Sequence, residues 1–325
     1  MTLREVYSAI TIGGNPVDII SVEVSEGHRQ TTSSCNIEVS DISGINLNDE
    51  IVIDIGYSDE HGEIFRGYVD QIGTIWQPGS FSITGRDILK MALENFIVST
   101  DLDNPWSREN ISAEALVGDL LGEAHITNYS GAATGFTFGT QHPAEFNLMS
   151  SWDAINTICN ILAYNCFAEN DTVYFQRIFP VPSGAASHAF TVGNSGDLTV
   201  TDYQYNTDNL RNKVIVFGLK PIYAEASAAS PYLPADFYKT AVVSSELIDT
   251  QGMADDSADY NLDLYNKLTE NLNLEAEGDY RVRVRDTVSV TEPFIPDAEG
   301  DWFVFALSHR LAESSGYTMS MTLSR

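Results

Sequence analysis

The stretch GYVDQIGTIWQPGSFSITGRDILKMALENF, residues 67–96, changes from a β-ribbon to a helix without a linker. Two strand-like runs flank the sequence QPGS, in which proline presets one turn angle and glycine accepts a positive φ. Apolar residues then recur at the spacing of one helix face, namely Ile88, Leu89, Met91, Ala92, Leu93 and Phe96. The stretch predicts a tight strand–turn–strand that is followed at once by a helix.

Three residues mark the switch between the two structures: Gly85, Arg86 and Asp87. Gly85 has no Cβ, so we expect the backbone to bend out of the strand ladder at this position. Asp87 can accept hydrogen bonds from the first free N–H groups of the helix. We expect the helix to cover the open end or edge of a β-barrel.

The segments around this stretch differ in character. Residues 50–57, EIVIDIGY, alternate apolar and polar side chains as a half-buried strand does. Short strands joined by tight turns indicate a sandwich or a barrel. After residue 97 we instead predict helices beginning near Ser112 and at 151–163, and then a hairpin whose tip is at 169–171.

Strands return after residue 200. LRNKVIVFG, residues 210–218, is typical of a buried strand, and the prolines in residues 219–252 predict irregular structure. Residues 253–274 predict a helix with exposed aspartates on its outer face: Asp255, Asp259 and Asp263.

The segment 274–285 separates polar from apolar residues by alternate positions. The polar set is Glu275, Glu277, Asp279, Arg281, Arg283 and Arg285, and the apolar set is Leu274, Ala276, Tyr280, Val282 and Val284. A turn near Gly278 would place the acids opposite the arginines as cross-strand pairs. We therefore predict a hairpin with its apolar set in a barrel core.

The charge is the most informative feature of the composition. The 325 residues include 17 Lys+Arg and 46 Asp+Glu, a net charge of −29. A chain this acidic repels nucleic-acid phosphate, so two interpretations remain open: a highly soluble surface, or a surface that DNA passes without being held. No run approaches the length of a membrane span, and we interpret Cys35, Cys159 and Cys166 as reduced core residues.

Motifs for catalysis or metal binding are not found in the sequence. The six histidines are scattered, and none has the spacing of a metal motif such as His-Glu-x-x-His. The sequence also contains no Gly-x-Ser-x-Gly nucleophile elbow and no Walker phosphate loop. Residues 101–104, DLDN, begin like a calcium loop but lack its later ligands, and we interpret them as a polar turn. We expect no catalytic residue, no metal site and no cofactor.

Several motifs, in this order, resemble one protein family. They are GYVDQIG, FSITGRDILKMALE, WDAINTICNILAYNCFAENDTVYF, NLRNKVIVFG, VRDTVSV and DWFVFALSHRLAESSGYTMSMTL. Together they resemble the late control gene D, or baseplate hub, family of tailed phages, whose members also form the first part of type VI secretion spike proteins. The resemblance covers nearly the whole chain.

The resemblance implies a mainly β fold with an α+β insertion: two tube-type β-barrel domains flanking a small α+β domain. We expect the first barrel at 1–97, the α+β domain at 98–200, and the second barrel at 201–325 with a helical or irregular insertion at 219–272. It also implies a homotrimeric structural hub of the virion tail tip or baseplate, assembled in the host cytoplasm. Such a ring adapts the hexameric tail tube to a central spike or tip.

The implied partners are a second and third copy, tail tube and distal tail proteins, a separate spike or tip protein, and genomic DNA that passes during ejection without specific binding. No membrane insertion is expected. We expect Arg281, Arg283 and Arg285 at subunit interfaces, and Glu275, Glu277 and Asp279 on an acidic channel wall. The two barrels are expected to superpose, and one continuous sheet through both would count against separate barrels.

Two other classes of function stay open at this stage. Paired carboxylates among so many acids are compatible with a virion-associated cell-wall hydrolase. Exposed aromatic residues such as Trp76, Trp106 or Tyr232 are compatible with a glycan-binding adhesin. Of the three classes we favour the hub, and we expect the protein not to be an enzyme.

Overall fold

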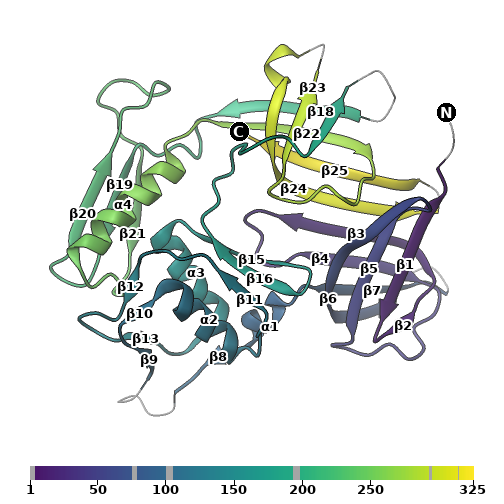
Figure 1. The fold of residues 1–325 in the computed structure, drawn as a ribbon, viewed down its shortest axis with the longest axis horizontal. Helices are drawn as coiled ribbons and strands as arrows, with labels where there is room; N and C mark the ends of the chain where they lie inside the picture. Colours follow the sequence, from purple (N-terminus) through teal and green to yellow (C-terminus); the bar gives the residue numbers. More distant parts are fainter. Residues whose placement is uncertain (1–3, 75–78, 100–104, 193–197, 293–294, 314) are drawn as a thin grey trace.

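The computed structural model describes residues 4–74, 79–99, 105–192, 198–292, 295–313 and 315–325. These residues form two β units and a mixed unit (Figure 1). The first β unit is drawn in purple and blue, the second in green and yellow, and the mixed unit contains the helices. The predicted turn at 101–104 and Trp76 lie outside the described residues.

The first β unit is an antiparallel sheet with its own apolar core. Its strands lie in the order β3-β4-β7-β6-β5-β1-β2. They are β1 (Val6–Ile12), β2 (Asn15–Pro16), β3 (Ile19–Gly27), β4 (Ser34–Val39), β5 (Glu50–Tyr57), β6 (Glu60–Thr74) and β7 (Phe81–Arg86). Ile51, Ile53 and Ile55 are fully buried on one face of β5, so the predicted alternation is confirmed.

The second β unit surrounds a second apolar core that contains Trp302. It consists of β17 (His188–Thr191), β18 (Leu198–Asn206), β22 (Thr269–Glu277), β23 (Thr287–Thr291), the short helix η1 (Pro296–Ala298), β24 (Gly300–Ala312) and β25 (Gly316–Ser324). β17 and the first residues of β18 precede residue 201, the boundary expected from the sequence. The unit therefore starts earlier in the chain than the motif pattern indicated.

The two β units share one continuous sheet. β3 and β24 pair along their lengths, with Ser25 opposite Ser308 and Glu23 opposite Arg310. The mainly β fold with two β units is confirmed, but the expectation that they form separate sheets is wrong. The physical reason is that β3 and β24 each offer a free edge with the same polar and apolar alternation, so pairing them leaves neither edge exposed.

The mixed unit holds most of the helical structure. It contains α1 (Leu89–Glu94), β8 (Phe96–Ile97), β9 (Trp106–Arg108), β10 (Ile111–Ser112), α2 (Ala113–Glu123), β11 (Tyr129–Gly131), β12 (Thr137–Phe138), β13 (Ala144–Phe146), β14 (Met149–Ser150), α3 (Ser151–Leu162), β15 (Asn165–Glu169) and β16 (Thr172–Gln176). Ser112 caps α2 by accepting a hydrogen bond from the Ala115 amide at 3.4 Å, as predicted. Antiparallel pairing of β15 with β16 confirms the predicted hairpin.

The inserted segment between β18 and β22 packs on this mixed unit. It forms β19 (Lys213–Phe217), β20 (Tyr223–Ser227), β21 (Thr240–Ser244) and α4 (Gln251–Tyr265). Val214, Val216 and Ala254 share one core with α2 and α3. The prediction of irregular structure at 219–252 is therefore wrong for β20 and β21, because the prolines lie between strands.

The predicted helix at 253–274 is too long. α4 ends at Tyr265, and β22 begins at Thr269. Leu272 and Leu274 are spaced by two residues and are buried in the second β core, so they follow the strand period rather than the helix period. The exposed positions of Asp255, Asp259 and Asp263 on α4 are confirmed.

The strand-to-helix switch works partly as predicted. Asp87 accepts a hydrogen bond from the Leu89 amide at 2.9 Å and another from the Ser33 amide at 2.5 Å. Gly85, however, remains in the ladder, so the expected bend at this residue is wrong. A Cβ at Gly85 would lie 2.5 Å from Ile51 and 2.8 Å from a backbone oxygen, so glycine is needed here for close packing.

Arg86 and Lys90 bind the same carboxylate beneath this switch. Arg86 forms an ion pair with Asp70 and a second with Glu94 at 2.8 Å. The buried Lys90 ammonium reaches Asp70 at 2.7 Å. These contacts connect β6, β7 and α1, so Arg86 holds the helix against the sheet that precedes it.

Candidate functional site

The segment that follows β22 crosses from the second β unit to the first. β22 ends at Glu277 and pairs with β18 and β25, and residues 279–286 form no strand. The predicted hairpin at 274–285 is therefore wrong. Val282 and Val284 are nevertheless buried in the second core with Leu274 and Ala276, as the alternation predicted, whereas Tyr280 of the same set is only partly buried and packs against the first core.

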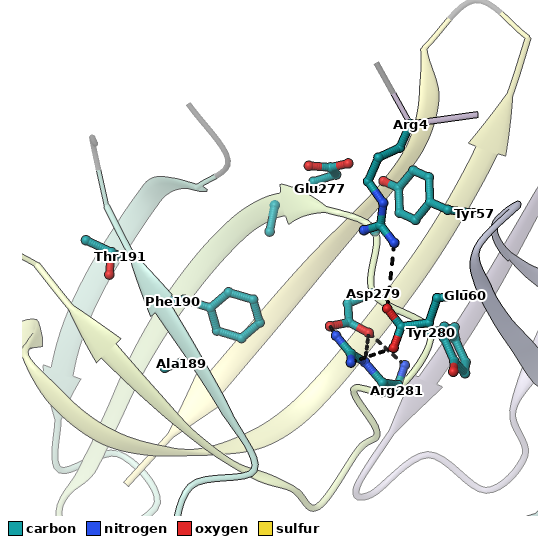
Figure 2. Close-up of a pocket in the computed structure, with 12 residues that line it drawn as sticks. Arg4, Tyr57, Glu60, Ala189, Phe190, Thr191, Glu277, Asp279, Tyr280 and Arg281 are labelled. Carbon is teal, nitrogen blue, oxygen red and sulfur yellow. Dashed lines mark hydrogen bonds and ion pairs between the residues drawn. The ribbon is translucent and has the colours of Figure 1, made fainter. Parts of the chain in front are cut away.

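A cleft of about 290 Å³ lies between the two β units at this crossing (Figure 2). Figure 2 shows Arg4, Tyr57 and Glu60 on one side, from the first unit. Asp279 and Arg281 lie beside Glu60, Glu277 lies near Arg4, and Ala189, Phe190 and Thr191 lie on the opposite side. Glu277, Asp279 and Arg281 are three of the residues singled out from the sequence.

Ion pairs already occupy most of the charged groups of the cleft. Arg281 donates to Asp279 at 2.8 and 2.9 Å and to Glu60 at 2.7 Å. Burial alone would raise the pKa of Asp279, but the hydrogen bonds from Arg281 outweigh burial and lower it. Burial and the Glu277 carboxylate raise the pKa of Tyr57. The arrangement is suited to holding the β units together rather than to acid–base chemistry.

Arg283 and Arg285 lie deeper at the same crossing. Arg283 donates to the Glu63 backbone oxygen at 2.6 Å. The Arg285 guanidinium lies 3.4 Å from the centre of the Phe167 ring, which belongs to the β15–β16 hairpin. Arg285 thus connects the second β unit to the mixed unit, and both arginines make their contacts within one chain.

Two carboxyl groups of the first β unit face Arg285. Burial raises the pKa of Glu26 to about 7, and the positive charges of Arg283 and Arg285 oppose this shift. Burial likewise raises the pKa of Asp87 to about 6. Burial lowers the pKa of Arg285 to about 10. We name this group of three residues, Glu26, Asp87 and Arg285, the charged joint.

The three arginines were expected at subunit interfaces. Within one chain Arg281 and Arg283 contact β6, because residues 279–286 fold back onto it instead of continuing β22, and a role between subunits stays a prediction. Only Arg281 keeps half of its side chain exposed, at 50%. Glu275 and Glu277 are exposed on β22, whereas Asp279 is partly covered in the cleft.

A polar face runs across the shared sheet on the side opposite the two cores. Two rows of facing residues can be followed from β22 to β7 through the strand registers. The first row is Glu277, Thr318, Arg310, Glu23, Asn36 and Thr84, and the second is Glu275, Ser320, Ser308, Ser25, Ser34 and Arg86. The rows cross the β24–β3 junction without interruption, so both β units contribute to one surface.

Hydroxyl groups and carboxylates dominate this polar face. Ser308 donates to Glu23 at 3.3 Å, and Ser21 donates to Glu38 at 3.3 Å. Four glutamates on the face, Glu23, Glu38, Glu275 and Glu277, accompany two arginines, Arg86 and Arg310, which gives a net charge of −2. Of these glutamates, only the two on β22, Glu275 and Glu277, were expected on a channel wall from the sequence. The period-two alternation of IISVEVSEG, residues 19–27, could have identified Glu23.

The remaining candidates carry no evident chemistry. Burial lowers the pKa of His28 and of His309 to about 3, so both rings are neutral. Trp106 donates to Glu123 at 2.8 Å and is partly covered by Arg108, whereas Tyr232 is exposed. Within the described ranges, no group of three or more His, Cys, Asp or Glu side chains is placed to hold a metal ion.

The cysteines and the helices agree with the composition. Cys35, Cys159 and Cys166 are buried free thiols, as predicted. No helix in the described part of the chain combines the length and the apolar character that crossing a membrane requires.

Comparisons with known proteins give no match in sequence: no family model and no curated protein matches the chain. Solved structures do match in fold. The 43 kDa tail protein of prophage MuSo2 from Shewanella oneidensis has a TM-score of 0.71 at 10% identity, over 99% of this chain and 98% of that chain. The tail protein from Neisseria meningitidis MC58 has a TM-score of 0.69 at 12% identity, over 99% and 97%.

The chain has the fold of phage tail proteins. An E. coli component of the type VI secretion system, described as structurally similar to T4 bacteriophage tail proteins, also matches. Its TM-score is 0.58 at 10% identity, over 97% of this chain and 76% of that chain. The resemblance to the baseplate hub family is thereby confirmed at the level of the tail-protein fold, although sequence identity is low.

Proposed function

We propose that this protein is the structural hub of a phage tail tip or baseplate. In this proposal three copies form a ring that adapts the hexameric tail tube to a separate spike or tip protein. The observation that carries the proposal is the polar face, which runs through both β units of one shared sheet. Two β units per chain give six tube-like units in a trimer, which matches the symmetry of a hexameric tube.

The two ends of the shared sheet supply surfaces for such a ring. β18 is the last strand at one end, and β1 with the short β2 lies at the other. Unpaired edges of this kind favour pairing with another chain. We infer that β18 of one copy pairs with β1 of the next, so that the sheet continues around the ring.

The polar face is then the wall of the channel through which genomic DNA passes. Each Lys or Arg that neutralises a phosphate adds counterion release and slows sliding, whereas carboxylates and hydroxyls do not. Salt at about 0.15 M screens charges beyond about 8 Å, so an acidic wall lowers friction without forming a barrier. The paired carboxylates of the cleft support a structural and non-enzymatic role for the protein in the virion.

The mass of the particle in solution tests the ring. One chain has a mass of 35.7 kDa, so a trimer has three times this mass, 107 kDa. We expect light scattering of the purified protein to give the trimer mass at micromolar concentration. A stable particle of one chain, with no larger species as concentration rises, would contradict the ring.

Reversing the charge of the polar face tests the channel. We expect Glu23→Lys with Glu275→Lys and Glu277→Lys to create duplex DNA binding that the unmodified protein lacks. The affinity of this variant for DNA should fall as salt rises. The logarithm of the binding constant should decrease with the logarithm of the salt concentration, with a slope of about −0.9 for each phosphate contacted. Electrophoretic mobility with a duplex oligonucleotide measures this gain.

A matched control has the same change in net charge on the outer face of α4: Asp255→Lys with Asp259→Lys and Asp263→Lys. Equal DNA binding by this control would show that net charge, rather than the polar face, decides the result. The channel proposal would then fail.

A further inference from the structure

Two adjoining cavities form a groove where all three units meet. One, of about 240 Å³, lies between the β3–β4 turn, α3 and α4. The other, of about 330 Å³, lies between the end of α4 and strands β18, β22, β24 and β25. Arg29, Leu264 and Tyr265 line both cavities, so the two spaces adjoin, and we call them together the junction groove.

The charge of the junction groove is opposite to that of the protein. Arg29 is exposed, and Lys267 is half-buried with its ammonium 4.4 Å from the centre of the Phe179 ring. In the part of the chain that the structure describes, neither cation has a carboxylate within ion-pair distance, although Asp263 lies near Lys267. Arg325 is already paired with Glu270 at 2.7 Å, and Asp202 is the acid that lines the groove.

Unpaired cations are uncommon in this chain. Most of the 17 Lys and Arg side chains contact carboxylates or backbone oxygens. A chain with a net charge of −29 can readily neutralise any surface cation, so two unpaired cations facing one groove indicate that their partner comes from another molecule.

The groove also presents amide groups that match a peptide backbone. Asn156, Asn160 and Asn209 line it, and their side chains make no hydrogen bond with any described residue. The His28 ring is 4% exposed, lines the groove, and has no partner for Nδ1. Each amide offers both donors and an acceptor, which is the set that an extended chain requires.

Apolar side chains complete the groove. Trp152 lies at one end, and Leu268 and Phe305 lie at the other, all partly exposed. The site thus combines two unpaired cations, free amides and apolar contacts. This combination fits a chain whose carboxylates alternate with apolar residues.

We propose that the junction groove binds an extended acidic segment of a neighbouring protein. The carboxylates of that segment pair with Arg29 and Lys267, and its backbone bonds to the asparagine amides. Duplex DNA fits less well, because it carries one charge per about 1.7 Å and the groove offers only two free cations within a strongly acidic surface. The proposal goes beyond the ring and does not depend on it.

Fluorescence anisotropy with a labelled peptide tests the proposal. The probe is a peptide in which aspartate alternates with leucine, and the control peptide has asparagine in place of aspartate. We expect the acidic probe to bind, and Arg29→Glu and Lys267→Glu each to weaken it by about tenfold, as loss of a charge-assisted contact would. Arg29→Lys, which keeps the charge, should retain most of the binding.

Lys220→Glu is the matched control, because Lys220 is an exposed cation outside the groove. It should leave binding unchanged, and the thermal unfolding curves of all variants should overlay that of the unmodified protein. Equal binding of both peptides, or an equal loss with Lys220→Glu, overturns the proposal. So does competition by a duplex oligonucleotide, or a change in particle mass with Arg29→Glu in place of peptide binding, since the occupant would then be DNA or a second copy.

Discussion

We expect Arg285→Met to lower the free energy of unfolding by about 1–3 kcal/mol at about pH 8, and by much less at about pH 5. Arg285 is the cation of the charged joint, where the three units of the chain meet. Its guanidinium lies against Phe167 of the mixed unit, and the carboxyl groups of Glu26 and Asp87 face it from the first β unit. Methionine keeps the length of the side chain and removes only the charge and its contacts.

The pH dependence follows from the two carboxyl groups. Glu26 and Asp87 have folded pKa values of about 7 and about 6, above their usual values of 4.5 and 3.8. A carboxyl with a raised folded pKa contributes stability below its unfolded pKa, and this contribution is lost as pH rises through the folded pKa. In the unmodified protein Arg285 limits that loss, because it favours the ionised form of both groups.

Without Arg285 the pKa values of both carboxyl groups rise further. The variant therefore loses more stability than the unmodified protein as pH rises from about 5 to about 8. At the acidic end of this range both groups are largely protonated. Arg285 is then a cation in a partly apolar site without these two anions, so removing it lowers the free energy of unfolding less than at pH 8.

Chemical denaturation at the two pH values measures the effect. Arg281→Met is the matched control, since Arg281 is half exposed. This change should lower the free energy of unfolding by no more than about 1 kcal/mol. Adding Glu26→Gln to Arg285→Met should restore part of the stability at the higher pH. A loss that is the same at both pH values would show that packing on Phe167, and not charge compensation, gives Arg285 its role.

The local structure in the opening stretch was predictable because short-range physics determines it. The alternation of Ile51, Ile53 and Ile55 identified a half-buried strand, and Asp87 next to an apolar helix pattern identified the switch. Both depend on neighbours a few residues apart. Local sequence patterns carry this information well.

The pairing of β3 with β24 was not predictable in the same way. Glu23 and Arg310 face each other across nearly the whole length of the chain, and a strand's own sequence does not specify which edge it will meet. The false hairpin at 274–285 has a related cause. Alternation predicts which side chains are buried but not that they lie in a strand. Val282 and Val284 are buried although they lie in a loop.

The candidate site was predictable only in part for the same reason. Glu275 and Glu277 were identified as surface acids from their positions between buried residues, and the structure places them on the polar face. The arginines could not be placed from sequence, because their partners, Glu60 and Glu63, lie more than 200 residues away along the chain.

We expect Tyr205→Pro to convert the proposed trimer into single chains with an intact fold. β18 is the outermost strand at its end of the sheet, and Tyr205 is 68% exposed. The direction of the Tyr205 N–H follows from its neighbours. Glu270 and Arg325 exchange backbone hydrogen bonds at 3.2 and 3.3 Å, so the backbone groups of Glu270 face β25.

Backbone groups alternate in direction along an antiparallel strand, so those of Asn271 face β18 and bond to Gln204, which lies opposite. The N–H of Tyr205 therefore points away from the sheet, toward the edge that the next copy would use. Proline removes this N–H and places its ring in the path of an incoming strand, while the bonds between β18 and β22 remain.

Gln204→Pro is the matched control, because the same change one residue earlier removes a bond within the chain. It should lower the free energy of unfolding of the single chain, whereas Tyr205→Pro should change it little. Light scattering then separates the outcomes. A Tyr205→Pro protein that keeps the mass of 107 kDa would show that the copies do not join through the β18 edge, and the ring would need a different interface. A protein of 35.7 kDa that unfolds like the unmodified chain would place the interface at that edge, because this N–H makes no hydrogen bond within the part of the chain that the structure describes.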